Sequence, residues 1–277
     1  MKFFRGQDPL SLVLRIFVWG AAAITFLALC FLVVHVLWHG LPSLSLSLFS
    51  PEYNTENQSL LPALLNTAVI TVCALIVAIP LGVFAAVYLT EYAKRGNKIV
   101  RVIRVASETL AGIPSVVYGL FGMIFFVTFV GLGYSLIAGA LTLAIMVLPL
   151  ILRTTEEALL AVPDSYREGS FGLGAGKVRT VFSIILPAAV PGISAGVVLA
   201  IGRIVGETAA LIYTAGTVAE MPKTLLSSGR TLSVHMYQLS REGLHFDKAY
   251  ATALMLLVMV ALINWISTKL AKKMERT

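Results

Sequence analysis

Six long apolar stretches restrict what this chain can fold into more than any other feature. They cover residues 12–38, 61–90, 109–130, 134–152, 184–215 and 249–267. A bilayer core about 30 Å thick is crossed by about 20 apolar residues in a helix. The sequence therefore predicts an all-α membrane protein with six transmembrane helices. The first stretch exceeds the roughly 7–15 apolar residues of a signal peptide and is interpreted as a retained anchor.

The composition excludes several classes of soluble protein. Of the 277 residues, 58% are hydrophobic and 13% are charged, whereas an average soluble domain carries roughly 25% charged residues. Too few charges remain to cover the surface of a soluble protein. A soluble single-domain enzyme, a disordered chain and a nucleic-acid-binding module are excluded on this ground.

The net charge of +7 is explained by the position of the basic residues. Most of the 21 Lys and Arg residues fall before the first stretch, after the second, after the fourth and after the sixth. Residues 39–60, on the opposite side, include Glu52 and Glu56 and contain neither Lys nor Arg. The positive-inside rule then places both termini in the cytoplasm. The charge therefore indicates membrane orientation and not a nucleic-acid partner.

Two segments on the predicted outer side have patterns of their own. Residues 43–48 alternate Ser and Leu, which fits a short strand or an interfacial segment. Residues 216–249 contain apolar patches near Leu225 and over 232–239. We expect a short helix there, lying on or dipping into the outer leaflet.

The sequence contains no recognisable catalytic, nucleotide-binding or metal-binding motif. The string 174–178 lacks the Ser or Thr that holds Mg²⁺ in a phosphate-binding loop. His35 and His39 lie four residues apart without a third ligand, which favours interfacial histidines over a metal site. Cys30 and Cys73 lie inside apolar stretches and are interpreted as inert thiols. We expect a non-enzymatic chain that binds no cofactor itself, with any ATP bound by another chain.

The predicted cytoplasmic segment 153–183 has the pattern of two helices joined by a glycine turn. Residues 163–168 form a helix start, because Pro163 suits a first turn and acidic residues favour the positive end of the helix dipole. Glycines at 172, 174 and 176 end that helix, and a second one begins at Lys177. The segment is either an element that docks into a partner or a solvated connector.

Seven residues of this region stand at a characteristic spacing. They are Glu168, Gly169, Ser170, Gly174, Ile184, Leu186 and Pro187. The spacing resembles the EAA loop of binding-protein-dependent ABC importer permeases, E-A-A-x3-G-x9-I-x-L-P, with Gly169 and Ser170 in place of its two alanines. Both replacements are small, although Gly lowers helix propensity by ~1 kcal/mol relative to Ala. The resemblance implies that these residues couple the chain to an ATPase.

Three further strings, at 110–122, 153–158 and 203–208, are similar to those of PstA-type permeases of phosphate ABC importers. PstC-type permeases share several of them, and the likeness covers about residues 60–268. It implies a MetI-like fold in the bacterial cytoplasmic (inner) membrane. It also implies three partners: a PstC-type second permease, a PstB-type ATPase homodimer holding ATP and Mg, and an extracytoplasmic PstS-type phosphate-binding protein.

Arg203 and Glu207 are charged residues in a stretch that otherwise has the composition of a membrane span. A charge at the bilayer centre costs ~3 kcal/mol on insertion scales, so such residues face the protein interior or a cavity. Residues four apart share a helix face. The two are interpreted either as a stabilising ion pair or as part of a substrate path, in which Arg203 contacts an anion, Glu207 holds Arg203 and Thr208 adds a neutral donor. The resemblance favours the path.

Small residues and a proline interrupt the third stretch. They are Gly112, Pro114, Gly119 and Gly122. Pro114 removes a backbone hydrogen bond and tends to kink a helix, and glycines permit close helix approach. A gating bend and plain packing both remain open. Glu108, just before the stretch, is interpreted as a solvated acid at the cytoplasmic interface.

Three parts are predicted along the chain. Residues 1–58 form an N-terminal tail, the first span and an outer loop, residues 59–269 a lipid-embedded permease core with its coupling loop at about 153–183, and residues 270–277 a cytoplasmic tail. The predicted function is the permease subunit of an ATP-driven phosphate importer. The alternatives are a permease for sulfate, molybdate or tungstate and, in another class, an ion-driven secondary transporter or channel.

Overall fold

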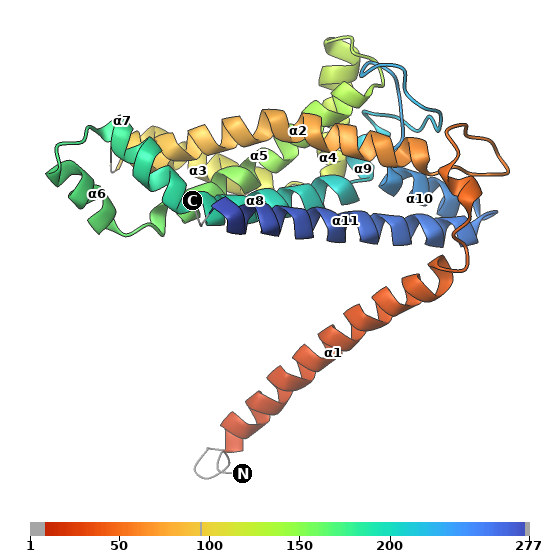
Figure 1. The fold of residues 1–277 in the computed structure, drawn as a ribbon, viewed down its shortest axis with the longest axis horizontal. Helices are drawn as coiled ribbons and strands as arrows, with labels where there is room; N and C mark the ends of the chain where they lie inside the picture. The colour runs from red at the N-terminus through yellow and green to blue at the C-terminus, as the bar shows by residue number, and fades with distance from the viewer. Residues whose placement is uncertain (1–8, 95, 275–277) are drawn as a thin grey trace.

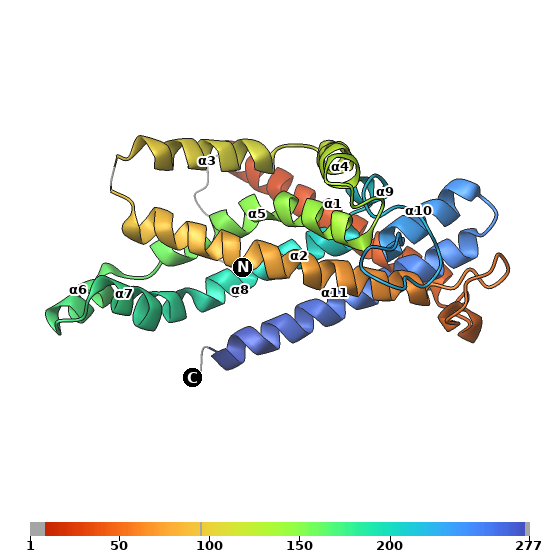
Figure 2. The same ribbon diagram turned by 90° about the horizontal axis from the view of Figure 1, so that it is seen from above.

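The protein is a bundle of long helices, seen in a computed structural model that describes residues 9–94 and 96–274. The tail predicted before residue 9, the residue at 95 and the last three residues of the predicted C-terminal tail lie outside this range. Helices α2 (Leu61–Val87), α5 (Leu136–Leu160), α8 (Leu186–Gly206) and α11 (Phe246–Met274) run along the long axis of the molecule (Figures 1 and 2). The prediction of an all-α membrane protein is confirmed.

Helix α5 lies at the centre of the bundle, between α2 and α8. Its buried residues Leu143, Val147 and Ile151 share one core cluster with Ile70 of α2 and Ile204 of α8. Small residues bring α2 and α5 close together, which is how helices associate in lipid. A Cβ at Gly82 of α2 would stand 2.7 Å from the Cγ2 atom of Ile151.

Helix α1 (Pro9–Gly40) leaves the bundle at an angle (Figure 1). The C-terminal end of α1 packs against the N-terminal part of α11, where Gly40 approaches Tyr250 and Leu254. Most of its large apolar side chains are exposed, including Phe17, which is 72% exposed. Such a surface is compatible with lipid on most sides of the helix, as expected of a membrane anchor.

The third predicted span, from about residue 109 to 130, is not one continuous helix, because its first residues belong to a separate helix that lies at a large angle to the rest. An amphipathic helix, α3 (Lys98–Ala111), ends at Gly112, and α4 (Ser115–Gly122) with a π-helical segment (Met123–Phe129) follows at 102° to it. The break falls at the glycine and proline that the sequence marked. Within the described residues, five helices are long and apolar enough to cross a membrane, and a sixth span results only if this bent pair is counted as one.

The predicted fourth span is longer than expected. Helix α5 continues from residue 152 to Leu160, so the first turns of the predicted coupling loop belong to it. The exposed pair Arg153 and Glu157 has helical i, i+4 spacing, with 2.9 Å between Nε and Oε1, and supports this polar extension by about 0.2–0.5 kcal/mol. After it come α6 (Asp164–Gly172), α7 (Lys177–Thr180) and a π-helical segment (Val181–Ile185) leading into α8. The predicted sequence of helix, glycine turn and helix is confirmed.

The opposite end of the bundle, which we call the α10 end, contains the short helix expected in 216–249 and no strand over 43–48, where a strand was one of the two alternatives. Residues Leu46–Phe49 form a short 3-10 helix and not a strand. After α9 (Ala209–Ile212) comes α10 (Leu232–Glu242), which packs against α11 and α2. Its residues Leu232, Val234 and Leu239 are buried in the protein, so α10 does not simply lie on a leaflet.

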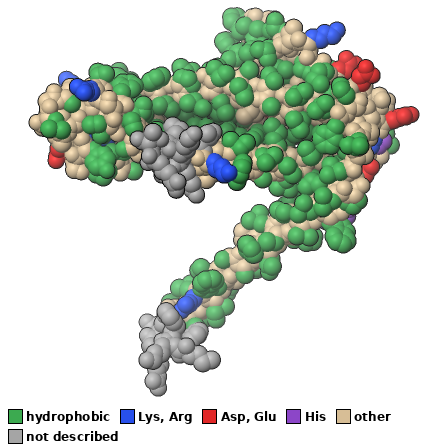
Figure 3. All heavy atoms as spheres, viewed as in Figure 1, with side chains coloured by type: hydrophobic (Ala, Val, Ile, Leu, Met, Phe, Trp, Pro, Cys, Tyr) green, Lys and Arg blue, Asp and Glu red, His purple; other side chains and the backbone are tan. Residues whose placement is uncertain are grey.

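Charged and apolar side chains separate along the molecule. Figure 3 shows hydrophobic side chains along the bundle and α1, with Lys, Arg, Asp and Glu gathered mainly at the ends. Helices α6 and α7 occupy one end, which we call the α6 end, and the end of α11 points toward it (Figure 1). The segments that the positive-inside rule assigns to the cytoplasm therefore point to one end of the molecule.

Candidate functional site

Arg203 and Glu207 do not form the predicted pair on one helix face. Helix α8 ends at Gly206, and Glu207 follows in extended conformation with ψ 128°. Its Oε1 accepts a hydrogen bond from the backbone N–H of Ala210 at 3.0 Å, and its carbonyl accepts one from Ser233 Oγ at 2.5 Å. The four ion pairs among the described residues do not include these two. Glu207 thus caps α9 and connects it to α10. It does not share a helix face with Arg203, because α8 ends one residue before it.

Arg203 instead lines a cavity of about 560 Å³ between α8, α3 and α5. Its side chain is half-buried. The wall of the cavity extends along α5 from Pro149 to Leu160 at the α6 end. Thr208, the third residue of the predicted path, is half-buried one position beyond Glu207, and its hydroxyl donates to the Gly206 carbonyl at 3.4 Å.

Five further charged residues share this cavity with Arg203, and of these the sequence singled out Glu108, as a solvated acid at the cytoplasmic interface. They are Arg104 and Glu108 of α3 and Arg153, Glu156 and Glu157 of α5. Arg104 Nη2 lies 2.5 Å from Glu156 Oε1, and this ion pair joins α3 to α5. From the sequence, Arg104 and Arg153 are basic residues that set the membrane orientation, and Arg153 also stands in the string 153–158 of the resemblance. The signal that was available is the helical spacing of polar residues over 98–111.

The break between α3 and α4 is held by a hydrogen bond. The hydroxyl of Tyr118 in α4 donates to the carbonyl of Leu110 in α3 at 2.8 Å. Gly112 ends α3, and Pro114 precedes the first residue of α4 with ψ 141°. The polar face of α3 is thereby turned to the cavity, while Ile99, Val102 and Val105 remain exposed.

Gly119 and Gly122 both lie at close helix contacts. A Cβ at Gly119 would stand 2.8 Å from the Cα of Ala210 in α9, and one at Gly122 would overlap the side chain of Thr142 in α5. A Cβ at Gly112, in contrast, meets only backbone of its own helix, the nearest atom being Thr109 O at 3.5 Å. Packing therefore accounts for the first two glycines, and a gating role of the break stays a prediction.

The predicted coupling residues form a hairpin at the α6 end. Glu168 and Gly169 are exposed on α6, whereas Ser170 is buried, with its hydroxyl 2.8 Å from that of Thr180 in α7. Gly174 has a φ of +81°, the left-handed conformation that glycine adopts without strain. The turn is thus set by Gly174, and the hairpin is closed by the Ser170–Thr180 contact.

The root and the tip of this hairpin differ in exposure. Ile184 and Leu186 pack partly on a buried cluster that includes Leu159 and Ile185, while Pro187 is exposed. At the tip, Leu173 is 91% exposed and Phe171 and Val178 are also exposed. An apolar tip on a braced hairpin is a surface typical of a protein contact.

A second cavity, of about 750 Å³, lies beside the first at the α6 end. Arg104, Glu108 and Leu160 line both cavities. Glu91 and Arg167 also line the second one, and Arg167 belongs to α6. Basic and acidic side chains therefore continue from the surroundings of Arg203 to the coupling hairpin.

The two histidines of α1 have an aromatic environment. The rings of His39 and Tyr250 stack at 5.0 Å, and His35 Nε2 lies 3.3 Å from the hydroxyl of Tyr250. Among the described residues, no group of His, Cys, Asp or Glu side chains has the arrangement of a metal site. The histidines thus contribute to the contact between α1 and α11.

Comparisons with known proteins agree with this architecture. Residues 78–276 match the family described as "Binding-protein-dependent transport system inner membrane component". The chain is 35% identical over 231 residues to "Probable ABC transporter permease protein YqgI" of Bacillus subtilis, covering 76% of this chain and 78% of that protein. It is 32% identical over 267 residues to "Phosphate transport system permease protein PstA 2" of Mycobacterium tuberculosis, covering 91% and 88%.

Solved structures of ABC transporters have a similar fold. A chain of the inward-facing MetNI methionine ABC transporter matches with a TM-score of 0.60 and 22% identity, covering 77% of this chain and 93% of that one. A chain of a bacterial alginate ABC transporter, in complex with its periplasmic protein, matches with a TM-score of 0.69 and 14% identity, covering 98% and 99%. The predicted MetI-like permease fold is confirmed.

Proposed function

The chain belongs to the binding-protein-dependent transport system inner membrane components, and within this family we propose that the solute it moves is inorganic phosphate. It is a multi-pass inner-membrane permease subunit of a bacterial ABC importer, without an ATPase site of its own. The alternative of an ion-driven secondary transporter or channel is wrong, because family membership assigns the chain to binding-protein-dependent transport. The proposal of phosphate draws support from relatives that are named phosphate permeases.

The observation that carries the proposal is the position of Arg203 in a cavity that reaches the α6 end of the bundle. A guanidinium group presents a rigid fork of N–H donors that matches the oxygens of a tetrahedral oxyanion. A half-buried guanidinium group such as that of Arg203 offsets part of the cost of removing an anion from water. Glu207, already engaged with α9 and α10, leaves Arg203 available to the anion.

The proposed complex contains a PstC-type permease, a PstB-type ATPase dimer that binds ATP and Mg, and a PstS-type phosphate-binding protein. The ATPase dimer receives the α6–α7 hairpin, with Glu168 and the exposed tip as its contact. The binding protein releases the anion at the α10 end. Closure of the ATPase dimer displaces α6, the permease pair changes between outward and inward access, and the anion passes Arg203 toward the cytoplasm.

The test is anion competition in a reconstituted system. The complex, purified with its partners through a tag on this chain and placed in proteoliposomes, is supplied with ATP and radiolabelled phosphate. We expect ATP-dependent phosphate uptake that excess sulfate, molybdate or tungstate does not reduce. Uptake of one of these other oxyanions in place of phosphate would overturn the proposed substrate and leave the importer assignment intact.

A further inference from the structure

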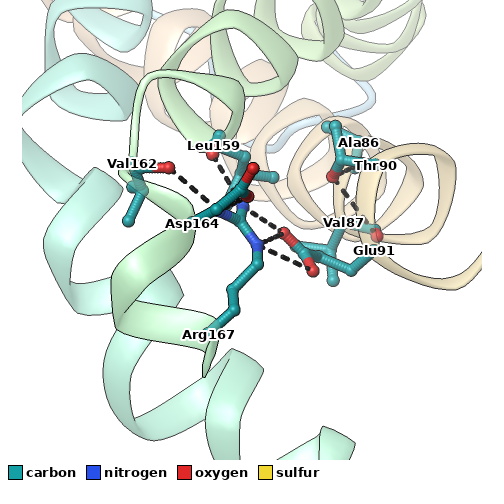
Figure 4. Close-up of polar contacts among 8 residues, drawn as sticks. All are labelled: Ala86, Val87, Thr90, Glu91, Leu159, Val162, Asp164 and Arg167. Atoms are coloured by element: carbon teal, nitrogen blue, oxygen red, sulfur yellow. Dashed lines mark hydrogen bonds and ion pairs between the residues drawn. The ribbon is translucent and has the colours of Figure 1, made fainter. Parts of the chain in front are cut away.

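Arg167, at the start of the coupling hairpin, is bound to the end of α2. Its Nη2 lies 2.6 Å from Glu91 Oε1, and its Nε donates to the same oxygen at 3.2 Å (Figure 4). Glu91 belongs to the π-helical segment Tyr88–Tyr92, which directly continues α2. The side chains are 18% and 9% exposed, so this ion pair is largely removed from water.

The same guanidinium group also binds the end of α5. Nη1 donates to the carbonyl of Val162 at 2.9 Å, and Nη2 donates to the carbonyl of Leu159 at 3.1 Å (Figure 4). Carbonyl groups in the last turn of a helix lack partners within the helix. Arg167 therefore donates to one carbonyl in the last turn of α5 and to one just beyond it while it holds the Glu91 carboxylate, so one side chain joins α5 and α6 to the segment that continues α2.

Adjacent residues of α6 face in different directions as a result. Arg167 is turned into the bundle, whereas Glu168, which carries the predicted contact to the ATPase, is exposed. The backbone between α5 and α6 passes through Pro163, which has no N–H to donate. The side chain of Arg167 thus supplies hydrogen bonds across a junction where the backbone supplies few.

We propose that Glu91 and Arg167 act as a positioning pair that makes α6 move together with α2 and α5. The inference rests on the proposed docking of α6 to an ATPase. A displacement of α6 then reaches the part of α5 that lines the Arg203 cavity. Without the pair, α6 moves independently at its junction, and ATP is hydrolysed without transport.

Among the ion pairs of the described residues, the pair of Arg167 and Glu91 differs from the others because it connects α6 to another part of the bundle. Arg153 and Glu157 lie within one helix, and both are more than half exposed. Asp164 contacts Arg167 Nη1 at 3.1 Å from the same helix and is 81% exposed. Neither contact joins α6 to another helix, and the remaining pair, Arg104 with Glu156, joins α3 to α5. Asp164 therefore offers a matched control, because it touches the same guanidinium group without linking elements.

The first experiment measures phosphate uptake per ATP hydrolysed by the whole complex in proteoliposomes. Glu91→Gln and Arg167→Gln are expected to lower this ratio by at least about fivefold, the lower end of typical coupling between sites, with hydrolysis maintained. Asp164→Asn is expected to keep the wild-type ratio. A wild-type ratio in both Gln variants overturns the positioning role, whereas a wild-type complex that takes up no phosphate contradicts only the proposed substrate.

A covalent bridge between positions 91 and 167 tests whether a physical link between the two segments is sufficient for coupling when both charges are absent. It also distinguishes loss of this link from loss of fold stability. In a background with Cys30→Ser and Cys73→Ser, the double variant Glu91→Cys with Arg167→Cys is treated with a short bismaleimide that joins the two thiols. We expect a low uptake ratio before bridging and recovery of most of it afterwards. If the unbridged variant is fully coupled, or the bridged one stays uncoupled, the inference is wrong. Failure of the unbridged and bridged variants alike to assemble also contradicts it, because the bridge supplies the proposed connection.

Discussion

Arg104 of α3 and Glu156 of α5 form an ion pair of 2.5 Å in the cavity that contains Arg203. Glu156 is 12% exposed and Arg104 is 47% exposed, so the guanidinium group is accessible from the cavity while its partner is covered. Arg104 lines both cavities, whereas Glu156 lines only the one that contains Arg203. The cytoplasmic half of the proposed path is thus lined by an arginine that a glutamate orients.

Arg104→Gln should slow phosphate uptake by about tenfold, the effect of losing ~1.4 kcal/mol of anion stabilisation. Arg104→Lys, which keeps the charge but not the fork of donors, should retain part of the rate. The measurement is ATP-driven uptake at equal amounts of assembled complex. Equal rates for wild type and Arg104→Gln would exclude Arg104 from the path.

Replacement of Glu168 by arginine should uncouple the complex. The side chain is exposed on α6 and has no ion-pair partner among the described residues, so its replacement leaves the fold of this chain unchanged. We expect Glu168→Arg to assemble poorly with the ATPase or to hydrolyse ATP without uptake. Full coupled transport in this variant would contradict the docking of α6.

Substitution of Gly122 should lower the thermal stability of the protein, whereas substitution of Gly169 should leave it equal or raise it. Gly122→Val places a side chain against Thr142 and Thr214, and such overpacking costs about 1–3 kcal/mol. Gly169→Ala meets no atom within 4 Å and gains up to ~1 kcal/mol of helix propensity. Thermal unfolding in detergent should therefore show a lower midpoint for the first variant and an equal or higher one for the second. The reverse order would show that α4 is not packed as described.

The buried imidazole of His235 should make stability depend on pH. Burial, together with the nearby Arg230 guanidinium, lowers the pKa of His235 to about 3, whereas an unfolded His has a pKa of about 6.5. As the pH falls, His235 therefore binds a proton in the unfolded state at a higher pH than in the folded state. The contribution of the neutral imidazole is complete above about pH 6.5 and is lost progressively as the pH falls toward 3.

The comparison that tests this is between wild type and His235→Gln, which cannot titrate. The difference between their unfolding midpoints in detergent should change in favour of the Gln variant as the pH is lowered from about 6.5. A difference that stays constant from pH 7 to pH 4 would show that His235 is accessible to protons in the folded protein.

The predicted orientation is testable by labelling single cysteines in a background without Cys30 and Cys73. A cysteine at Glu52, near the α10 end, should react with an impermeant reagent added outside cells. A cysteine at Lys98, at the start of α3, should react only after permeabilisation. The opposite pattern would reverse the assignment of the α6 end to the cytoplasm.

The sequence predicted the helices whose signal is local. Apolar stretches of spanning length gave α2, α5, α8 and α11, and proline and glycine at 112–114 marked the break after α3. The size of the bend could not be predicted from the sequence. Helix α3 is amphipathic, with one polar and one apolar face, and the direction of such a helix depends on what it packs against. The interpretation of residues 98–108 as a loop was therefore wrong, whereas the expected kink near Pro114 is present as a 102° bend.

The site was predicted only in part, for a similar reason. Arg203 was singled out because a charge in an apolar stretch needs a partner or a cavity, and the cavity is present. Its pairing with Glu207 assumed an unbroken helix, which ends at Gly206. The contacts of Arg104 with Glu156 and of Arg167 with Glu91 join residues far apart in the chain, and no spacing rule reveals them.

The most direct test of the account is the uptake of radiolabelled phosphate by the reconstituted complex with Arg203→Ala. We expect this variant to assemble with its partners and hydrolyse ATP, and its phosphate uptake to fall to the level seen without ATP. Arg203→Lys should recover a part of the uptake. Normal uptake by the assembled Arg203→Ala complex would exclude Arg203 from the anion path and leave it with only a structural role.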